Sequence, residues 1–201
     1  MPGRTVVRAA LLVTGLVAHG AMAYPPAVGI LSKARSCMAC HVSNGPWADE
    51  EKTVIDILDA ATKTSLKGPD GVFRIEATRG EARKLLTVIG REKGEATPPR
   101  RNAWLYLDPT QMETTALSKF APGWDVNLPL SCRLVGDALE GREGAHLTVL
   151  PMTLRPLDAA RDAELELQVM LTSGEAVKGR GKDGMIGNYF VRKVRLKVLE
   201  R

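Results

Sequence analysis

The chain has few aromatic residues and none of the common signatures of an enzyme active site. Phe, Trp and Tyr make up 4% of its 201 residues, and no basic stretch is interleaved with them. Surfaces that bind nucleic acid combine clustered Lys and Arg with aromatic rings, so we expect no nucleic-acid partner. We also find no nucleophile triad, no phosphate-binding glycine loop and no paired carboxylates, and therefore do not expect an enzyme.

The sequence also lacks an apolar run that is long enough to cross a membrane. The longest run, Ala9 to Ala18, has about ten residues, whereas a membrane span needs roughly 20. Two arginines precede it and Ala21-Met22-Ala23 follows it, as in a secretory signal with a small-residue cleavage site. We predict that residues 1–23 are removed, and the alternative is an uncleaved anchor. The exported, periplasmic chain then begins at Tyr24 without a membrane span, and its formal net charge falls from +5 to +3 because two Arg are lost.

Cysteine is scarce, and two of the three cysteines lie close together. Cys37 and Cys40 stand in Ser-Cys-Met-Ala-Cys-His, residues 36–41, and Cys132 is far away in the sequence. In an oxidising compartment thiols tend to pair, and an odd number means that at least one is otherwise committed. We expect Cys132, in a strand-like segment, to be a small buried apolar residue.

Cys-x-x-Cys-His is the attachment motif of c-type haem. Two thiols about one helical turn apart can reach the two vinyl groups of one porphyrin, and the next residue then projects its imidazole toward the iron. The motif therefore predicts one haem c, with Cys37 and Cys40 as its thioethers and His41 as the proximal ligand. Export supports this interpretation, because c-type cytochromes mature outside the cytoplasm.

Three other interpretations of the motif remain open. A dithiol redox pair of the thioredoxin kind would follow a strand within a βαβ pattern, which is absent here. Half of a zinc site would need partners such as Cys132 or His146. A structural disulfide is the third.

The pattern of the chain changes after about residue 50, which predicts two parts. Residues 24–50 form a haem-attachment segment in which Ala27 to His41 is a short helix ended by Asn44-Gly45-Pro46. Residues 51–201 alternate apolar and polar side chains with period two, typical of half-buried strands. We predict a mainly β fold, an immunoglobulin-like β-sandwich, with a barrel as the alternative. The predicted strands are Val54 to Leu58, Val72 to Ala77, Leu85 to Ile89, Ala103 to Leu107, Ser131 to Val135, His146 to Leu154, Ala163 to Thr172 and Tyr189 to Leu199; Arg91 to Arg101 is predicted to be an exposed loop.

A haem iron held by His41 has a second axial position, for which several residues compete. His146 is the only histidine that remains outside the motif after cleavage, and Met185 lies in a glycine-rich loop. Three further methionines are available, of which two lie in predicted strands and are expected to fill the core: Met112, Met152 and Met170. The α-amine of Tyr24 is a further candidate, because its pKa near 8 makes deprotonation easy and Pro25-Pro26 would hold it in place.

The layout of Tyr24-Pro25, Cys37-x-x-Cys40-His41 and a β-rich remainder resembles cytochrome f. In that family the mature chain begins Tyr-Pro, the haem motif lies in a short helix, and the domain that follows is immunoglobulin-like. The resemblance implies that the Tyr24 amine is the distal iron ligand. An iron with five ligands is also possible.

We therefore expect an exported monohaem cytochrome that carries single electrons between redox proteins. The alternatives are an accessory subunit with a structural or relay haem, and a five-coordinate haem that senses or reacts with a small ligand. Lys193, Arg195 and Lys197 would form a basic stripe that steers an acidic partner, or else an ordinary solvated strand face.

Overall fold

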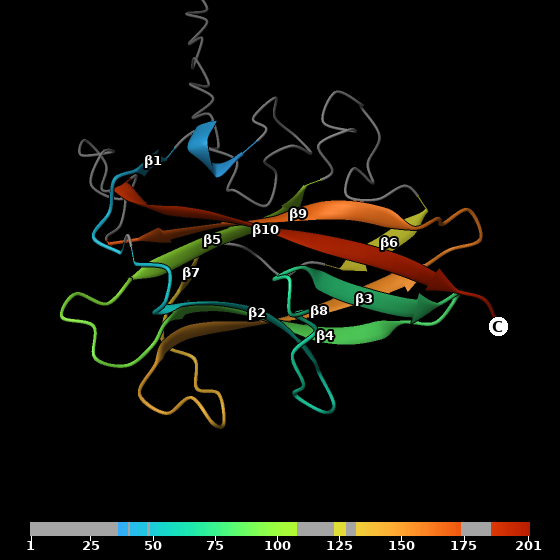
Figure 1. The fold of residues 1–201 in the computed structure, drawn as a ribbon, viewed down its shortest axis with the longest axis horizontal. Coiled ribbons are helices and arrows are strands. Elements are labelled where there is room, and N and C mark those ends of the chain that lie inside the picture. The colour runs from blue at the N-terminus through green and yellow to red at the C-terminus, as the bar shows by residue number, and fades with distance from the viewer. Residues whose placement is uncertain (1–35, 40, 48, 108–122, 128–131, 174–185) are drawn as a thin grey trace, which may run out of the picture.

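A computed structural model describes residues 36–39, 41–47, 49–107, 123–127, 132–173 and 186–201. The described residues form ten strands and one short 3-10 turn (Figure 1). The elements are the turn η2 (Cys37–Ala39) and the strands β1 (Val42–Ser43), β2 (Thr53–Asp59), β3 (Phe73–Thr78), β4 (Arg83–Arg91), β5 (Arg101–Leu107), β6 (Trp124–Asn127), β7 (Arg133–Leu134), β8 (His146–Pro156), β9 (Ala163–Thr172) and β10 (Ile186–Leu199).

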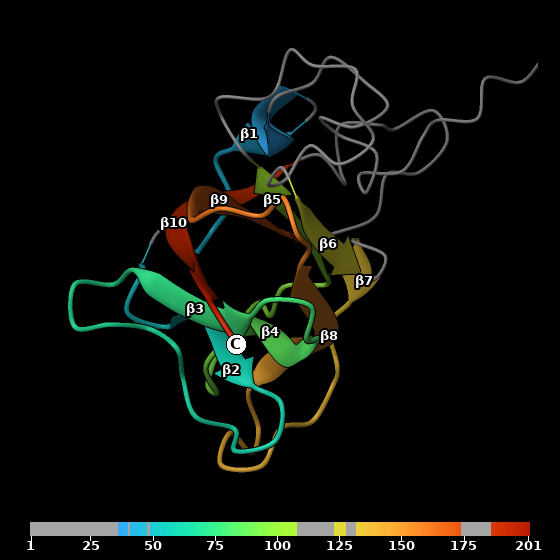
Figure 2. The ribbon, with the colours of Figure 1, turned by 90° about the vertical axis from the view of Figure 1, so that its right-hand side faces the viewer.

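The strands belong to two sheets. The first sheet has the order β1-β10-β9-β5-β7, and β3 also pairs with β10. The second has the order β2-β4-β8-β6, with all neighbours antiparallel. Seen from the side in Figure 2, the strands of the two sheets surround one interior. The long β10 pairs in parallel with β1 near its start and with β3 near its end.

One hydrophobic core lies between the sheets. It includes alternate residues of strands from both, for example Ile57 and Leu85 from the second sheet and Leu167 and Val194 from the first. The alternation is the one that the sequence shows, since a strand points successive side chains to opposite faces. Trp104 and Tyr106 meet edge to face in this core, with ring centroids 5.4 Å apart.

The predicted strands are confirmed, with changes at their ends, so the chain is mainly β as expected. Two short strands were not predicted, β1 and β6. The expectation of an exposed loop from Arg91 to Arg101 is wrong at both ends: Arg91 ends β4 and is 1% exposed, and Arg101 begins β5 and is half-buried. The guanidinium of Arg91 is held by acceptors of Asp49, Thr53 and Glu95, which sequence periodicity does not reveal.

The structure describes the predicted haem-attachment segment from residue 36 onward, and most of the helix predicted there lies outside the described residues. Within the described part only Cys37–Ala39 is helical, as a single 3-10 turn. Trp47, near the end of the same segment, is 1% exposed and belongs to the main core. No helix of the described residues is long and apolar enough to span a membrane.

Candidate functional site: the haem-attachment turn

The described part of the haem motif folds as one tight turn. The N–H of His41 donates to the carbonyl of Cys37 over 2.9 Å, which closes a helical turn between the first cysteine and the histidine. A haem-binding motif would need this geometry, because its cysteines and histidine would have to face one porphyrin from a single turn. We call residues 36–41 the attachment turn; Cys40 itself lies outside the described residues.

The attachment turn lies on the outer face of the first sheet. Figure 1 shows η2 above β10, β9 and β5, on the side away from the second sheet. Ala103, Met170 and Tyr189 are neighbours on these three strands, since Met170 is paired with both of the others. Cys37, 8% exposed, packs with Ala103 and Met170, and Tyr189 packs against this cluster. The turn thus rests on an apolar row that crosses the sheet, which we call the outer-face row.

A polar contact also ties the turn to the sheet. The N–H of Cys37 donates to Oε1 of Gln168 over 3.4 Å, and the Gln168 amide donates to Glu166 over 3.2 Å. Gln168 is 4% exposed although it lies on the outer face of β9. A buried amide is stable only when its polar atoms find partners, so this contact helps to fix where the turn sits.

The chain continues from the turn along the edge of β10. Val42 and Ser43 form β1 beside Ile186 and Gly187, and the Ser43 hydroxyl accepts from the N–H of Tyr189 over 3.1 Å. A Cβ added at Gly187 would collide with the carbonyl of Leu171 on the neighbouring strand. Glycine is therefore required where β1, β9 and β10 approach one another.

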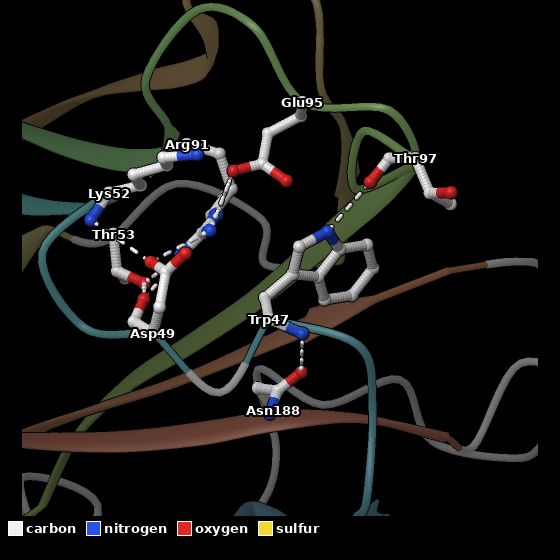
Figure 3. A network of polar contacts seen from close by, with 8 residues as sticks. All are labelled: Trp47, Asp49, Lys52, Thr53, Arg91, Glu95, Thr97 and Asn188. Carbon is white, nitrogen blue, oxygen red and sulfur yellow. Dashed lines mark hydrogen bonds and ion pairs between the residues drawn. The ribbon is translucent and has the colours of Figure 1, made fainter.

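Trp47 anchors the end of the attachment segment in the core. Its N–H donates to Oδ1 of Asn188 over 2.8 Å, and its indole Nε1–H donates to the carbonyl of Thr97 over 2.7 Å (Figure 3). A buried Trp needs a partner for its indole N–H, and the loop after β4 supplies it. The segment is consequently held by backbone pairing, by side-chain burial and by hydrogen bonds.

An ion network next to Trp47 joins the segment to β4. The side chain of Arg91 is 1% exposed and donates from all three nitrogens: to Glu95, to the hydroxyl of Thr53, and to the carbonyl and carboxylate of Asp49 (Figure 3). Partial desolvation opposes ionisation of Asp49, but the N–H of Lys52 and the guanidinium of Arg91 together lower its pKa. The buried charge of Arg91 is thereby compensated.

The structure separates the other candidate iron ligands. His146 begins β8 in the second sheet, whereas the attachment turn lies on the outer face of the first, and packed sheets are about 10 Å apart. Met152 is 2% exposed in the core, as expected for a core residue. Tyr24, Met112 and Met185 lie outside the described residues. Among the residues that the structure describes, no three His, Cys, Asp or Glu side chains gather as a metal site.

Two titratable groups next to the turn are shifted by burial. Burial raises the pKa of the Cys132 thiol to about 11, against the opposing charge of Arg101. Burial also raises the pKa of Tyr189, to which Cys37 and Glu166 add. Cys132 is half-buried and packs against the cluster around Cys37. The raised pKa favours the neutral thiol, but the expectation of a buried residue in a strand is met only in part, since Cys132 lies just before β7 with a positive φ.

The residues of the expected basic stripe are matched with acids. Lys193 and Arg195 both pair with Glu164, over 3.1 and 3.0 Å, and Lys197 pairs with Glu76 over 3.5 Å. All of these side chains are exposed, and such pairs contribute little to stability. The pairing favours an ordinary solvated strand face.

The outer-face row was missed by the sequence analysis, although the sequence contains a signal for it. In β9 the outward positions are Glu164, Glu166 and Gln168, and the next one is Met170. In β10 the outward residues near the end are basic, whereas Tyr189 lies at an outward position near the start. Apolar or aromatic residues thus replace polar ones at the outward positions of neighbouring strands. This pattern indicates that another segment covers this end of the sheet.

The described residues of the motif fit covalent haem attachment. Cys37 and His41 share one closed turn, and the side chains nearest to the turn are apolar or neutral. An apolar surface of this kind, with the charged Arg101 and Glu166 next to it, is compatible with a porphyrin.

Comparisons with known proteins place the chain in no family. No family model and no curated protein matches it. Among solved structures it is similar to a family 123 glycoside hydrolase from Clostridium perfringens, studied for glycolipid glycan hydrolysis, with a TM-score of 0.32 and 10% identity over 65% of this chain and 23% of that one. It is equally similar to AvmM, which catalyses macrocyclization in alchivemycin A biosynthesis, with a TM-score of 0.32 and 10% identity over 73% of this chain and 89% of that one. Neither is described as a cytochrome, and similarity at this level gives no guide to activity.

Proposed function

We propose that the protein is an exported c-type cytochrome with one haem, which carries single electrons between redox partners. The observation that carries the proposal is the closed turn between Cys37 and His41. Attachment of two thiols and an imidazole to one porphyrin requires such a turn, and here it lies on an apolar surface. When bound, the haem supplies an iron that cycles between its ferric and ferrous states.

Each residue of the motif has a role in holding the group. Cys37 and Cys40 supply the thiols for the two covalent links, and His41 supplies an imidazole for the iron. The outer-face row excludes water from one side of the turn, since Met170 is 0% exposed and Ala103 is 2% exposed. Exclusion of water lowers the local dielectric, one of the means by which a protein tunes a haem.

The second axial position has several candidates from the sequence. The resemblance to cytochrome f implies the α-amine of Tyr24, which exists only if the signal is cut after Ala23. His146 and Met185 are the alternatives. The position of His146 on the second sheet argues against it.

The strand order supports an immunoglobulin-like sandwich as the scaffold. In such folds one sheet has the order A-B-E-D and the other contains C-F-G. The second sheet, β2-β4-β8-β6, matches A-B-E-D, and β5-β9-β10 of the first sheet matches C-F-G. The parallel β3 at the free edge of β10 extends this sheet beyond the basic pattern. The fold would then be a carrier for the turn on the outer face of its C-F-G sheet.

Haem staining and mass spectrometry of the mature protein test the proposal. The full chain should be produced with its own signal in a bacterial host that exports and matures c-type cytochromes. We expect a mass increase of one covalent haem, an N-terminus at Tyr24 and reversible one-electron reduction. Cys37→Ala together with Cys40→Ala should abolish the covalent haem, while Cys132→Ala, a matched cysteine outside the motif, should keep it.

The same material separates the electron carrier from the alternatives. A mature wild-type protein without covalent haem would refute the proposal altogether. If haem is present and the reduced protein binds carbon monoxide rapidly, the iron has an open position and a ligand-sensing role is favoured. An electron carrier with two axial ligands should bind it slowly or not at all.

A further inference from the structure

Met170 lies at the centre of the surface on which the attachment turn rests. Its side chain is 0% exposed and occupies the middle of the outer-face row, between Ala103 and Tyr189. Its neighbours Val169 and Leu171 point into the main core, so Met170 points away from it. Cys37 packs against Met170 in the small cluster on this face. Met170 is therefore buried on the outer face of the first sheet, in contact with the cluster that contains Cys37, and not in the core between the sheets.

The sulfur of Met170 is turned toward the chain that follows His41. A Cβ added at Gly187 would lie 2.9 Å from Sδ of Met170, so the sulfur lies over this glycine. Gly187 is paired with Ser43 of β1, two residues after His41. The thioether thus lies over β10 at the point where β1, the strand that follows His41, pairs with it, and the same side chain packs in the cluster with Cys37.

We propose that Met170 is the second axial ligand of the haem iron, through its thioether sulfur; the inference rests on the proposed function. A thioether is neutral and needs no deprotonation, in contrast to an α-amine with a pKa near 8. It can therefore remain buried at any pH, which suits a fully buried position. Paired with histidine it is a common ligand set in electron-carrying cytochromes and raises the reduction potential.

The positions of the other described methionines and of His146 favour Met170. Met152 lies between the two sheets, and His146 begins a strand of the second sheet. Met38 is 41% exposed and sits inside the attachment turn itself. Among these four side chains, Met170 alone is buried and also packs against the attachment turn without being part of it.

Optical spectroscopy of the matured full-length protein tests the assignment. Ferric haem with a thioether ligand shows a near-infrared sulfur–iron charge-transfer band. We expect this band in the wild type and its complete loss in Met170→Leu, with the covalent haem retained and the reduction potential lowered. Leucine preserves most of the volume, so the sheet should tolerate it. Met152→Leu is the matched control for a buried methionine and should keep the band, as should a chain with one residue added before Tyr24.

The outcomes separate the two proposals. Absence of covalent haem in the wild type overturns both. Covalent haem without the band, or a band that persists in Met170→Leu, overturns the Met170 assignment alone; a spectrum changed only by the N-terminal extension would assign the amine of Tyr24.

A second measurement decides the assignment if Met170→Leu does not fold. The methyl group of an iron-bound methionine gives a strongly shifted proton resonance in the reduced protein. This resonance should persist when each of the other four mature methionines is replaced by leucine, namely Met38, Met112, Met152 and Met185. Loss of the resonance in any one of these variants, or its absence in the wild type, would overturn the assignment.

Discussion

Several arginines of the described residues form ion pairs, and replacing Arg91 should destabilise the protein more than replacing any other of them. Its side chain is 1% exposed and makes five hydrogen bonds between 2.6 and 3.1 Å, which matches the five N–H donors of a guanidinium. Arg91→Met removes the charge and leaves Glu95, whose side chain is 11% exposed, without its cation. Loss of one partner of a buried ion pair costs about 3–5 kcal/mol. Asp49 is half-exposed and regains water, so we expect the lower end, about 3 kcal/mol.

Urea denaturation followed by circular dichroism measures this loss as a change in the free energy of unfolding. Arg155→Met is the matched control. Arg155 pairs with Asp125 over 2.7 Å, but their side chains are 46% and 52% exposed, so the change should stay within about 0.5 kcal/mol. In the double variant Arg91→Met with Glu95→Gln, part of the stability should return, because no carboxylate is then left buried. If Arg91→Met costs no more than Arg155→Met, the network of Figure 3 does not hold the segment in solution.

Three further predictions concern stability. Tyr106→Phe should leave the free energy of unfolding unchanged or raise it by up to about 1 kcal/mol, because the buried hydroxyl of Tyr106 lies near that of Thr87 without a well-formed hydrogen bond between them; a loss above about 1 kcal/mol in urea denaturation would contradict this. Gly187→Ala should lower the free energy of unfolding by about 1–3 kcal/mol, because the new methyl group would collide with the Leu171 carbonyl. An unchanged melting temperature would show that the two strands are not so close. The hydrogen bonds from Arg74 hold the pKa of Asp70 well below its usual range. The contribution of Asp70 to the free energy of unfolding is therefore complete above about pH 4, the pKa of an unfolded Asp, and is lost as the pH falls through the lower pKa of the folded state. On acidification, the urea midpoint should fall less steeply in Asp70→Asn than in the wild type.

The strands could be predicted from the sequence because burial there follows a simple local rule. The alternation from Leu165 to Leu171 places one set of side chains in the core, and the structure has them there. The short strands escaped prediction for a physical reason. β1 has two exposed residues and exists only because β10 offers it an edge, a contact between segments far apart in the chain.

The residues that contact the Cys-x-x-Cys-His motif in the fold could not be predicted from local patterns in the same way. Cys37 and His41 are recognisable from local spacing, and the structure closes the turn between them. Met170 was interpreted as core filler, because it lies in a strand and periodicity alone does not say which face of a sheet is covered. Arg91 was placed in an exposed loop, because the stretch that it begins contains Gly94, Pro98 and Pro99, and charged residues usually lie in solvent.

The two faces of β9 connect the attachment turn with the main core. Val169 and Leu171 are 0% exposed in the core between the sheets, and Met170 between them is 0% exposed under the turn. Interiors are close-packed, so a shift of Met170 toward or away from the turn would also displace its two neighbours and disturb the core. An electron carrier benefits from a site that hardly rearranges when the charge of the iron changes. The turn lies on a strand whose opposite face is packed in the core, so the proposed function as an electron carrier would have such a site.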